Sequence, residues 1–313
     1  MEPAVRHAIA RLPAAPGVYR FRDGRGHVLY VGRATALRSR VSSYWRDLAG
    51  RQHLARMVAG VRAVEAVACA SVHEAAWLER NLLETSLPRW NRTPGGQENP
   101  VYVRLDGRAA TPCLRVNHLA EPAPEGVRYF GPYLGGQRLR LAISALHRIW
   151  PLAYTGTRMS GTDRELAGRH GVGAGDRVAL VDELCAVLDR EPDAVGRARA
   201  RLAAARDRAA AAQAYETAGR IQEELRALDW IAAAQRVTVD GAGDCTVHGW
   251  SDGVLVTFAV VGGRVCRWSQ RRCAEAVAAP RLAATPAGWR PFAQRNAELA
   301  ADLLTLTPCQ RRP

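Results

Sequence analysis

The stretch GVYRFRDGRGHVLYVGR, residues 17–33, decides the fold prediction. Its β-branched and aromatic residues predict strands at 17–21 and 28–31. The gap between these strands holds Asp-Gly and a second glycine, which supply the positive φ angles that a chain reversal needs. We therefore expect a β-hairpin on which Tyr19 and Tyr30 could face a common site. The residues of this stretch alone are equally compatible with an ordinary half-buried tyrosine pair.

Helical segments follow this hairpin. Residues 35–44 predict a helix with Thr35 as its N-cap, and residues 74–84 predict a second helix that leads to Pro-Arg-Trp-Asn at 88–91. The other elements expected in this part are a third strand at 61–69 and short helices at 1–12 and 52–59. The pattern predicts a compact α/β unit that ends before the Thr-Pro-Gly-Gly linker at 93–96.

Together, and in this order along the chain, these features form a specific signal. Two tyrosine tripeptides, a helix arginine at Arg40, a helix glutamate at Glu79 and a closing Asn91 resemble the GIY-YIG nuclease family. The resemblance is greatest to the N-terminal half of the UvrC excinucleases. It implies a nuclease domain at residues 13–93.

The resemblance also implies chemical roles. Glu79 is the expected ligand of a divalent cation, Mg²⁺ or Mn²⁺, because a carboxylate near the buried side of a helix needs a partner and hard cations prefer oxygen. The commoner role of a helix glutamate, a half-exposed surface carboxylate, fits Glu74 and Glu84 better. By resemblance, Tyr30 is the candidate general base and Tyr19 assists it, although a phenol with a pKa near 10 must first be activated.

Arginines complete the predicted site. The guanidinium of Arg40 suits the charge on the scissile phosphate. Arg33 replaces the lysine usual in UvrC; it can supply positive charge but cannot shuttle a proton. Arg38 and Arg46 are expected to contact the DNA backbone or to be plain surface charge, and Asn91 is expected to hold the loop or the hydrogen-bond network of the site.

Composition agrees with a polyanionic partner. The 313 residues carry a formal net charge of +14, and all of the basic side chains other than histidine are arginine. Nucleic acid is therefore a likelier partner than a membrane, although a generally basic surface would give the same charge. Seven scattered cysteines without a Cys-x-x-Cys spacing, and no signal peptide, indicate a reducing cytoplasm. No alanine-rich stretch is long enough to span a bilayer without an arginine.

The middle of the chain predicts a mixed linker region. Strands are expected at 102–105 and 113–117, followed by the Tyr-Phe-Gly-Pro-Tyr segment at 129–133 as a packed aromatic turn and a helix at 138–150. This segment again resembles UvrC. Residues 154–174, where UvrC carries a cysteine cluster, contain no cysteine, so we expect no iron–sulfur cluster.

Residues 197–235 are rich in Ala, Arg, Glu and Leu and predict a long helical region. Within it, residues 214–228 resemble the UVR motif, which implies a helical hairpin that pairs with a UvrB-type protein. The expected partner contacts are Tyr215, Glu216, Ile221, Leu225 and Leu228. The apolar stripe alone also fits a helix packed on this chain's own core, or a self-associating coiled coil.

The last region, 237–313, predicts strands at 254–261 and 264–268 joined by a Gly-Gly turn, and a helix at 291–304. We find no counterpart of the RNase H-like nuclease domain or the helix-hairpin-helix module of UvrC, so the sequence resembles the shorter relatives known as Cho. The expected fold class is α+β: a GIY-YIG α/β domain at 13–93, a linker domain at 94–190, a UVR-like helical segment at 191–236, and a β-hairpin with a helix at 237–313.

The expected function is that of a metal-dependent DNA endonuclease. By resemblance it makes a single nick, 3′ to the lesion, in damaged double-stranded DNA during nucleotide excision repair, after a UvrB-type protein has opened the site. The alternative is a non-catalytic adaptor that binds DNA and UvrB. A restriction or homing nuclease would fit the first domain but not the segments at 129–133 and 214–228.

Overall fold

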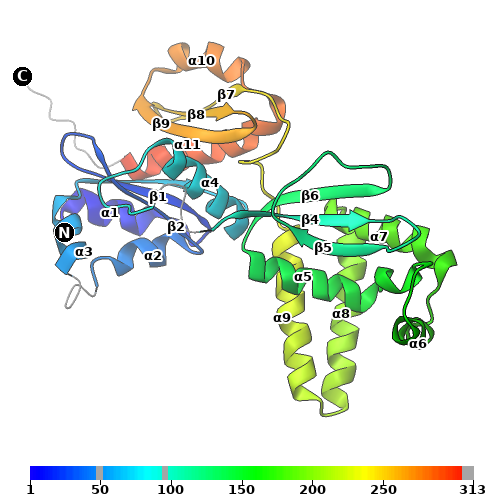
Figure 1. The fold of residues 1–313 in the computed structure, drawn as a ribbon. Coiled ribbons are helices and arrows are strands. Elements are labelled where there is room, and N and C mark those ends of the chain that lie inside the picture. The colour runs from blue at the N-terminus through cyan, green and yellow to red at the C-terminus, as the bar shows by residue number, and fades with distance from the viewer. Residues whose placement is uncertain (47–51, 94–97, 305–313) are drawn as a thin grey trace, which may run out of the picture. The chain divides into compact units, whose positions relative to one another are not determined.

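The computed structural model describes residues 1–46, 52–93 and 98–304 and groups the chain into two compact units (Figure 1). Unit 1 combines the residues up to Gln97 with the C-terminal part from Gln235, and unit 2 contains Glu98–Ala234. The predicted linker at 93–96 falls almost wholly outside the described residues, and so does Cys309. No described helix is long and apolar enough to cross a membrane.

The first sheet of unit 1 has the order β2-β1-β3, with β1 at Gly17–Arg22, β2 at Val28–Ala34 and β3 at Ala63–Ala68, and both pairings are antiparallel. The predicted hairpin is confirmed. Its register places Tyr19 opposite Gly32 and Phe21 opposite Tyr30. Because side chains alternate along a strand, Tyr19 and Tyr30 lie on the same face of the sheet.

Four helices accompany this sheet: α1 at Pro3–Arg11, α2 at Leu37–Ser43, α3 at Gln52–Gly60 and α4 at Val72–Thr85. The hydroxyl of Ser71 accepts a hydrogen bond from the backbone N–H of Glu74, 3.0 Å away, and so fixes the start of α4. The predicted N-cap of α2 is wrong. Ala36 occupies that place without a side-chain bond, because the strand β2 continues to Ala34 and delays the helix.

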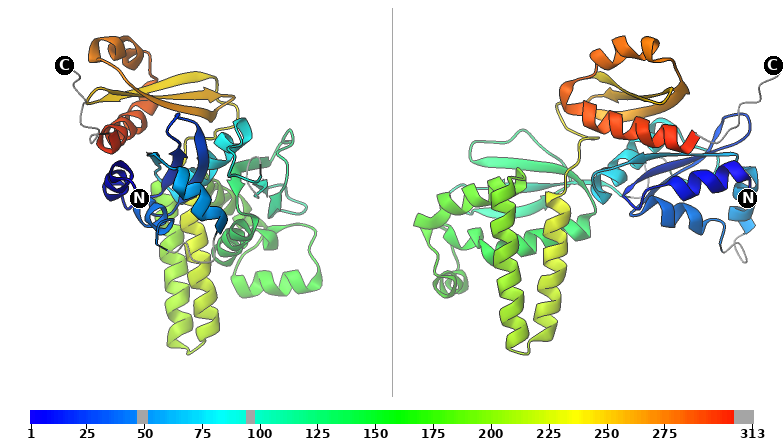
Figure 2. Two further views of the ribbon diagram at one scale, coloured as in Figure 1. Left: turned by 90° about the vertical axis from the view of Figure 1, so that its left-hand side faces the viewer. Right: turned by 180° about the vertical axis from the view of Figure 1, so that it is seen from behind.

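A second sheet in unit 1 has the order β7-β8-β9, with β7 at Cys245–Ser251, β8 at Val254–Val261 and β9 at Arg264–Arg272. The predicted Gly262-Gly263 turn is confirmed, and both glycines have positive φ. The sequence reading missed β7 and α10 (Glu275–Ala283). Helix α11, Arg290–Leu304, packs against β3 as well as β7 and β8, so it joins the two sheets (Figure 2).

Buried polar contacts make this junction specific. The Asn296 side chain on α11 accepts from the N–H of Ala68 at 2.7 Å and donates to the Ala68 carbonyl at 3.3 Å, which satisfies the backbone of the last residue of β3. On the far side of the first sheet, the Asn81 amide of α4 donates to the Val237 carbonyl at 3.1 Å and to the Thr238 hydroxyl at 2.9 Å. The N-terminal and C-terminal parts of unit 1 therefore form one compact body.

Unit 2 contains the sheet β5-β4-β6, with β4 at Pro100–Asp106, β5 at Cys113–Asn117 and β6 at Val127–Leu134. The Tyr-Phe-Gly-Pro-Tyr segment lies inside β6 and is not the predicted turn, because its backbone pairs with β4 while Phe130 and Tyr133 fill the core. The helices of unit 2 are α5 at Gly136–Ile149, α6 at Gly161–His170, α7 at Arg177–Leu188, α8 at Pro192–Ala211 and α9 at Tyr215–Ala232.

Helices α8 and α9 run side by side as a hairpin (Figures 1 and 2). Gln213, with a φ of 58°, makes the reversal between them. The inner side of α9 is held by Glu224, which is fully buried and accepts from Arg148 at 2.6 and 2.9 Å and from the Ser144 hydroxyl at 2.8 Å. These contacts dock α9 on α5. Short 3-10 turns complete the described structure at Leu152–Thr155, Ala174–Asp176 and, in unit 1, Ala287–Trp289.

Replacing Asn296 by alanine should destabilise unit 1, because the N–H of Ala68 loses its acceptor and the Ala68 carbonyl keeps only the 3.5 Å bond from Arg295 among the described side-chain donors. We expect the free energy of unfolding to fall by about 1–3 kcal/mol, measured by chemical denaturation. Gln294→Ala is the matched control, since Gln294 lies on the exposed side of the same helix and its amide donates to exposed Glu298 at 3.0 Å. Equal stability of the two variants would contradict the role assigned to Asn296.

Candidate active site

Three tyrosines meet on one face of the first sheet. The hydroxyls of Tyr19 and Tyr44 lie 2.7 Å apart. The ring of Tyr30 has its centroid 6.2 Å from that of Tyr19 and 6.0 Å from that of Tyr44. The two strands supply Tyr19 and Tyr30, and the residue that follows α2 supplies Tyr44. The predicted pair is therefore part of a triad of phenols.

Close packing explains the glycine of the second tripeptide. A Cβ atom on Gly32 would lie 2.5 Å from the Tyr19 hydroxyl and 2.8 Å from the Tyr30 ring. Any side chain there would displace both phenols. Gly17 is similar, because a Cβ would lie 2.2 Å from the Val67 carbonyl oxygen on the neighbouring strand. The glycines thus permit close approach of backbone and side chains.

Arg40 lies beside the triad. Its guanidinium carbon is 5.3 Å from the centre of the Tyr44 ring, within the range of a cation–π contact. The phenol of Tyr19 also interacts with this side chain, and the tyrosines raise the pKa of Arg40 against the lowering effect of burial. The residue as a whole remains exposed. The Arg40 guanidinium therefore lies next to the phenols in a residue that is open to solvent.

Glu79 on α4 faces the end of β2. One of its carboxylate oxygens accepts from the backbone N–H of Arg33 at 3.1 Å. The other oxygen lies 3.3 Å from Nε of the same arginine. The Glu79 side chain is 20% exposed, so the carboxylate is held in place yet open to an additional ligand.

The donor set suits a hard divalent cation. A carboxylate has about four lone-pair sites, and Arg33 uses only part of them. Mg²⁺ commonly binds through one or two carboxylates and keeps several waters. Among the described residues, no group of three or more His, Cys, Asp or Glu side chains converges as a ready set of ligands. The residues present therefore fit a mostly hydrated Mg²⁺ on Glu79.

The phenols are difficult to ionise in the absence of a cation. Burial raises the pKa of Tyr19 well above its ordinary value, and Tyr44 and Tyr30 add to the effect. Burial is also the largest cause of the raised pKa of Tyr30, with further contributions from Tyr44 and Glu79. Arg40 acts in the opposite direction on both. At neutral pH Tyr19 and Tyr30 are therefore protonated.

Asn91 is built into the edge of β2. Its side-chain oxygen accepts from the N–H of Val31 at 3.0 Å, and its amide donates to the Val31 carbonyl at 2.8 Å. The backbone N–H of Trp90 adds a bond to Leu29 at 3.1 Å. Asn91 thus acts as a strand partner for the segment that carries Tyr30 and Gly32.

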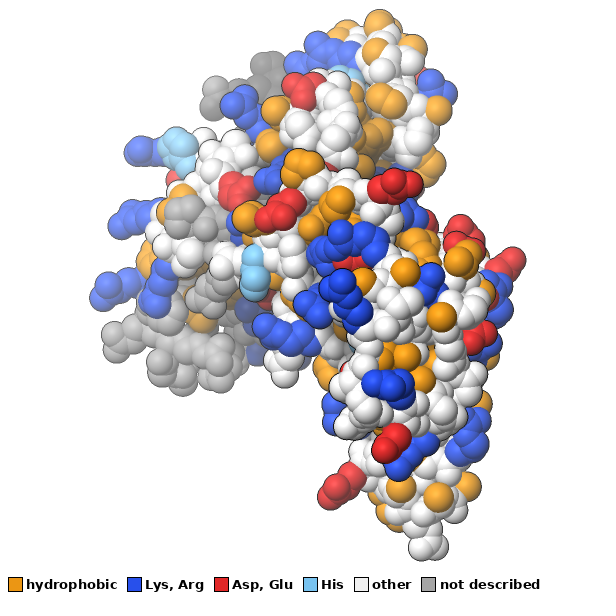
Figure 3. Space-filling model, turned by 45° about the vertical axis from the view of Figure 1, so that its right-hand side comes forward, with side chains coloured by type: hydrophobic (Ala, Val, Ile, Leu, Met, Phe, Trp, Pro, Cys, Tyr) orange, Lys and Arg blue, Asp and Glu red, His pale blue; other side chains and the backbone are white. Residues whose placement is uncertain are grey.

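The two arginines expected to contact DNA are exposed, but both have bonds within the chain. Nε of Arg38 donates to the Leu12 carbonyl at 2.7 Å, and Arg46 contacts the Ser42 hydroxyl. In Figure 3 the basic side chains, in blue, are scattered over the visible face with acidic ones between them.

The partner contacts expected on the UVR-like segment need correction. Ile221, Leu225 and Leu228 are 2%, 8% and 0% exposed and lie in the core of unit 2. They pack against this chain's own helices. This is the alternative, a helix packed on the chain's own core, that the apolar stripe left open in the sequence. Tyr215 is 70% exposed, and Glu216 is exposed beside it at the start of α9. Only these two remain available to a partner.

Tyr44 is the site residue that the sequence reading missed. It is 6% exposed and touches both predicted tyrosines. The signal was its position four residues after Arg40, which places both on one side of a helical turn. Tyr44, an aromatic residue one turn beyond the expected catalytic arginine, could therefore have been counted among the candidate site residues.

The model of the UvrC-like GIY-YIG domain matches residues 15–92. The chain is 33% identical over 276 residues to the UvrABC system protein C of Sphingopyxis alaskensis, covering 84% of this chain and 40% of that protein. For the same protein from Thermobifida fusca the identity is 31% over 286 residues, covering 85% and 42%. The chain thus spans about two fifths of the length of these curated relatives.

A solved structure is also similar. It is the N-terminal GIY-YIG endonuclease domain of UvrC from Thermotoga maritima, bound to its catalytic divalent cation, magnesium. It shares 29% sequence identity, covers 29% of this chain and all of its own, and has a TM-score of 0.28. From the matched domain and the curated relatives, we conclude that residues 15–92 belong to the UvrC-like GIY-YIG domain family and that the chain is a relative of the N-terminal part of UvrABC system protein C.

Proposed function

We propose that this protein is a metal-dependent DNA endonuclease that makes a single nick, 3′ to the lesion, in damaged duplex DNA during nucleotide excision repair. The observation that carries the proposal is the group of Tyr19, Tyr30 and Tyr44, with Arg40 beside it and with the Glu79 carboxylate near enough to raise the pKa of Tyr30. The relatives named above support DNA repair as the setting.

Each side chain has a task in hydrolysis. When bound at Glu79, Mg²⁺ supplies positive charge that polarises the phosphate and lowers the pKa of nearby proton donors. Arg40 neutralises charge that builds on the scissile phosphate. The fraction of Tyr30 that is ionised to the phenolate accepts the proton of the attacking water, and Tyr19 and Tyr44 hold the Tyr30 ring in place. Arg33 keeps the Glu79 carboxylate oriented through its backbone N–H.

The tip of the α8–α9 hairpin is proposed to bind a UvrB-type protein. Tyr215, 70% exposed, and the adjacent Glu216 are the side chains offered there. An exposed tyrosine gives a large contact area at low entropic cost. The buried stripe of α9 instead fixes the hairpin to unit 2.

The test is a nicking assay on an end-labelled duplex with one bulky lesion, run with Mg²⁺ or EDTA, and with or without UvrA and UvrB. We expect one nick that requires the cation and increases with UvrB. Wild-type protein that binds the UvrB–DNA complex but never cuts it would favour the alternative, a non-catalytic adaptor.

Glu79→Gln should lower the nicking rate by at least about 100-fold, because it removes the charge that holds the cation while keeping the shape of the side chain. Glu84→Gln is the matched control. Glu84 lies on the same helix, is exposed, and pairs with the arginines Arg80 and Arg264. The measurement is the initial rate at saturating Mg²⁺. If both variants cut as fast as wild type, Glu79 is not the ligand.

The nicking rate should rise with pH. Burial raises the pKa of Tyr30, so below that pKa only a small fraction is the phenolate that can accept a proton, and this fraction grows with pH. We expect the logarithm of the rate to increase by about one per pH unit between about pH 7 and 9. Tyr30→Phe should remove most of the activity. A flat profile, with Tyr30→Phe fully active, would eliminate this role.

The Arg33→Lys variant tests whether residue 33 only supplies positive charge or must also transfer a proton. If arginine only supplies charge and orients Glu79, lysine should support a nicking rate within about threefold of wild type. The backbone bond from residue 33 to Glu79 is unaffected by the change. Strong activity that appears only in Arg33→Lys would instead mean that the natural arginine blocks turnover and would favour the adaptor.

A further inference from the structure

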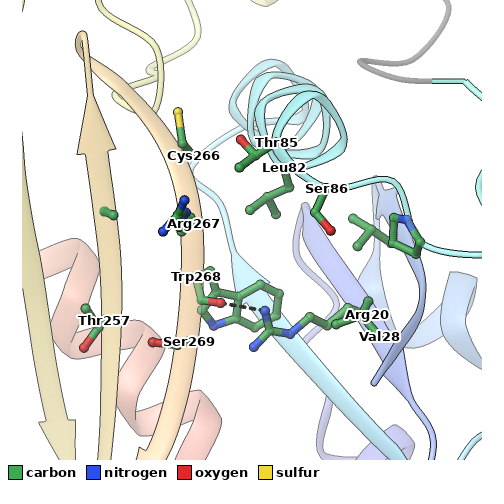
Figure 4. A pocket seen from close by; sticks show the side chains of 13 residues that line it. Arg20, Val28, Leu82, Thr85, Ser86, Thr257, Cys266, Arg267, Trp268 and Ser269 are labelled. Carbon is green, nitrogen blue, oxygen red and sulfur yellow. Dashed lines mark hydrogen bonds between the residues drawn. The ribbon is translucent and has the colours of Figure 1, made fainter. Parts of the chain in front are cut away.

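A cavity of about 450 Å³ lies in unit 1, between the first sheet, the end of α4 and strands β8 and β9 (Figure 4). It is on the face of the sheet opposite the tyrosine triad, because Arg20 and Val31, which line it, alternate with Tyr19 and Tyr30. Its volume is in the range of small-molecule sites. The active site described above makes no use of it.

The guanidinium of Arg20, which lines this cavity, is buried and lacks one of its hydrogen-bond partners among the described residues. Arg20 is 6% exposed. Its Nε pairs with Glu65, and its Nη1 donates to the Trp268 carbonyl at 2.6 Å, a bond drawn in Figure 4. Its Nη2 is buried without a hydrogen-bond partner among the described residues. A buried guanidinium donor of this kind calls for an acceptor.

The charge of the cavity favours an anion. Glu65 is shared by Arg20 and Arg22, so these three side chains together keep one positive charge. Arg267 adds another on the β9 side of the cavity. None of the described lining residues is acidic. The ligand should therefore carry negative charge.

The rest of the lining suits a flat, partly apolar group. Trp268, already stacked on the Arg20 guanidinium at 3.8 Å, forms one wall together with Val31 and Leu82. The Ser269 hydroxyl can donate and accept, and the Thr85 hydroxyl, which donates to the Asn81 carbonyl at 3.0 Å, can still accept. A planar base attached to a phosphate combines the anionic and the flat apolar character that these walls require.

The cavity is also close to the catalytic residues along two elements. Leu82 and Thr85 follow Glu79 on α4, which places Thr85 about 9 Å along the helix axis from it. Val31 directly precedes Gly32 on β2. We propose that this cavity binds one unstacked nucleotide. The source of this nucleotide rests on the proposed function: if that function holds, the nucleotide belongs to the DNA strand near the cleavage site.

Cys266 gives a local readout, because its thiol lines the cavity. The experiment measures alkylation of Cys266 in the full chain by mass spectrometry, with Cys273, outside the lining, as the internal reference. The probes are an oligothymidylate single strand, thymidine monophosphate and inorganic phosphate. We expect the oligonucleotide to slow alkylation of Cys266 at least fivefold and to leave Cys273 unchanged. Protection by the monophosphate as well would identify a site for free nucleotides; protection by the strand alone would identify DNA.

Arg267→Glu should abolish the protection, whereas Arg272→Glu, on the same strand but outside the lining, should keep it. Both arginines are exposed, so neither change threatens the fold. Full protection by inorganic phosphate alone would overturn the nucleotide assignment. So would unchanged Cys266 reactivity while the oligonucleotide demonstrably binds by fluorescence anisotropy. Nicking by the wild-type protein is measured separately. An unprotected Cys266 together with normal nicking rejects only the nucleotide site. A protected Cys266 without nicking rejects only the proposed nuclease activity.

Discussion

Everything in unit 1 depends on the way α4 is held from two sides. Toward β2, the Glu79 carboxylate accepts from the backbone of Arg33. Toward the C-terminal part, Asn81 bonds residues 237 and 238, and the buried Glu74 carboxylate accepts from the N–H of Arg236 at 3.0 Å. A helix fixed by directional bonds on opposite faces cannot slide or rotate without breaking buried polar contacts. The position of the proposed metal ligand is thus set partly by residues more than 150 positions later in the chain.

Local chemistry made the first sheet and the tyrosine pair predictable. The Asp-Gly turn and the alternation of Tyr19 with its neighbours predict a hairpin from a stretch of 17 residues. The Gly-Gly turn before β9 was predictable for the same reason. Such features need no knowledge of distant contacts, so a single sequence is sufficient.

What could not be predicted depends on tertiary contacts. The stripe of Ile221, Leu225 and Leu228 has the same spacing whether it faces a partner or the chain's own core, and only the docking of Glu224 on Arg148 decides between them. The Tyr-Phe-Gly-Pro-Tyr segment resembles a turn until β4 pairs with it. The polar side chains of Asn81 and Asn296 look like surface residues, because their partners belong to a part of the chain that returns after unit 2.

The discontinuity of unit 1 has a consequence for the order in which the protein can mature on the ribosome. Helix α11, which covers the edge of β3, begins roughly 200 residues after the end of the first segment. At about 5–20 residues per second, the nascent first sheet waits on the order of 10–40 s before that helix is made. During this interval the hydrogen-bonding edge of β3 and the back of α4 remain uncovered. Unit 2 has been fully synthesised by then. The nascent chain therefore carries a complete unit 2 together with a first sheet whose strand edge is still open to pairing with other chains.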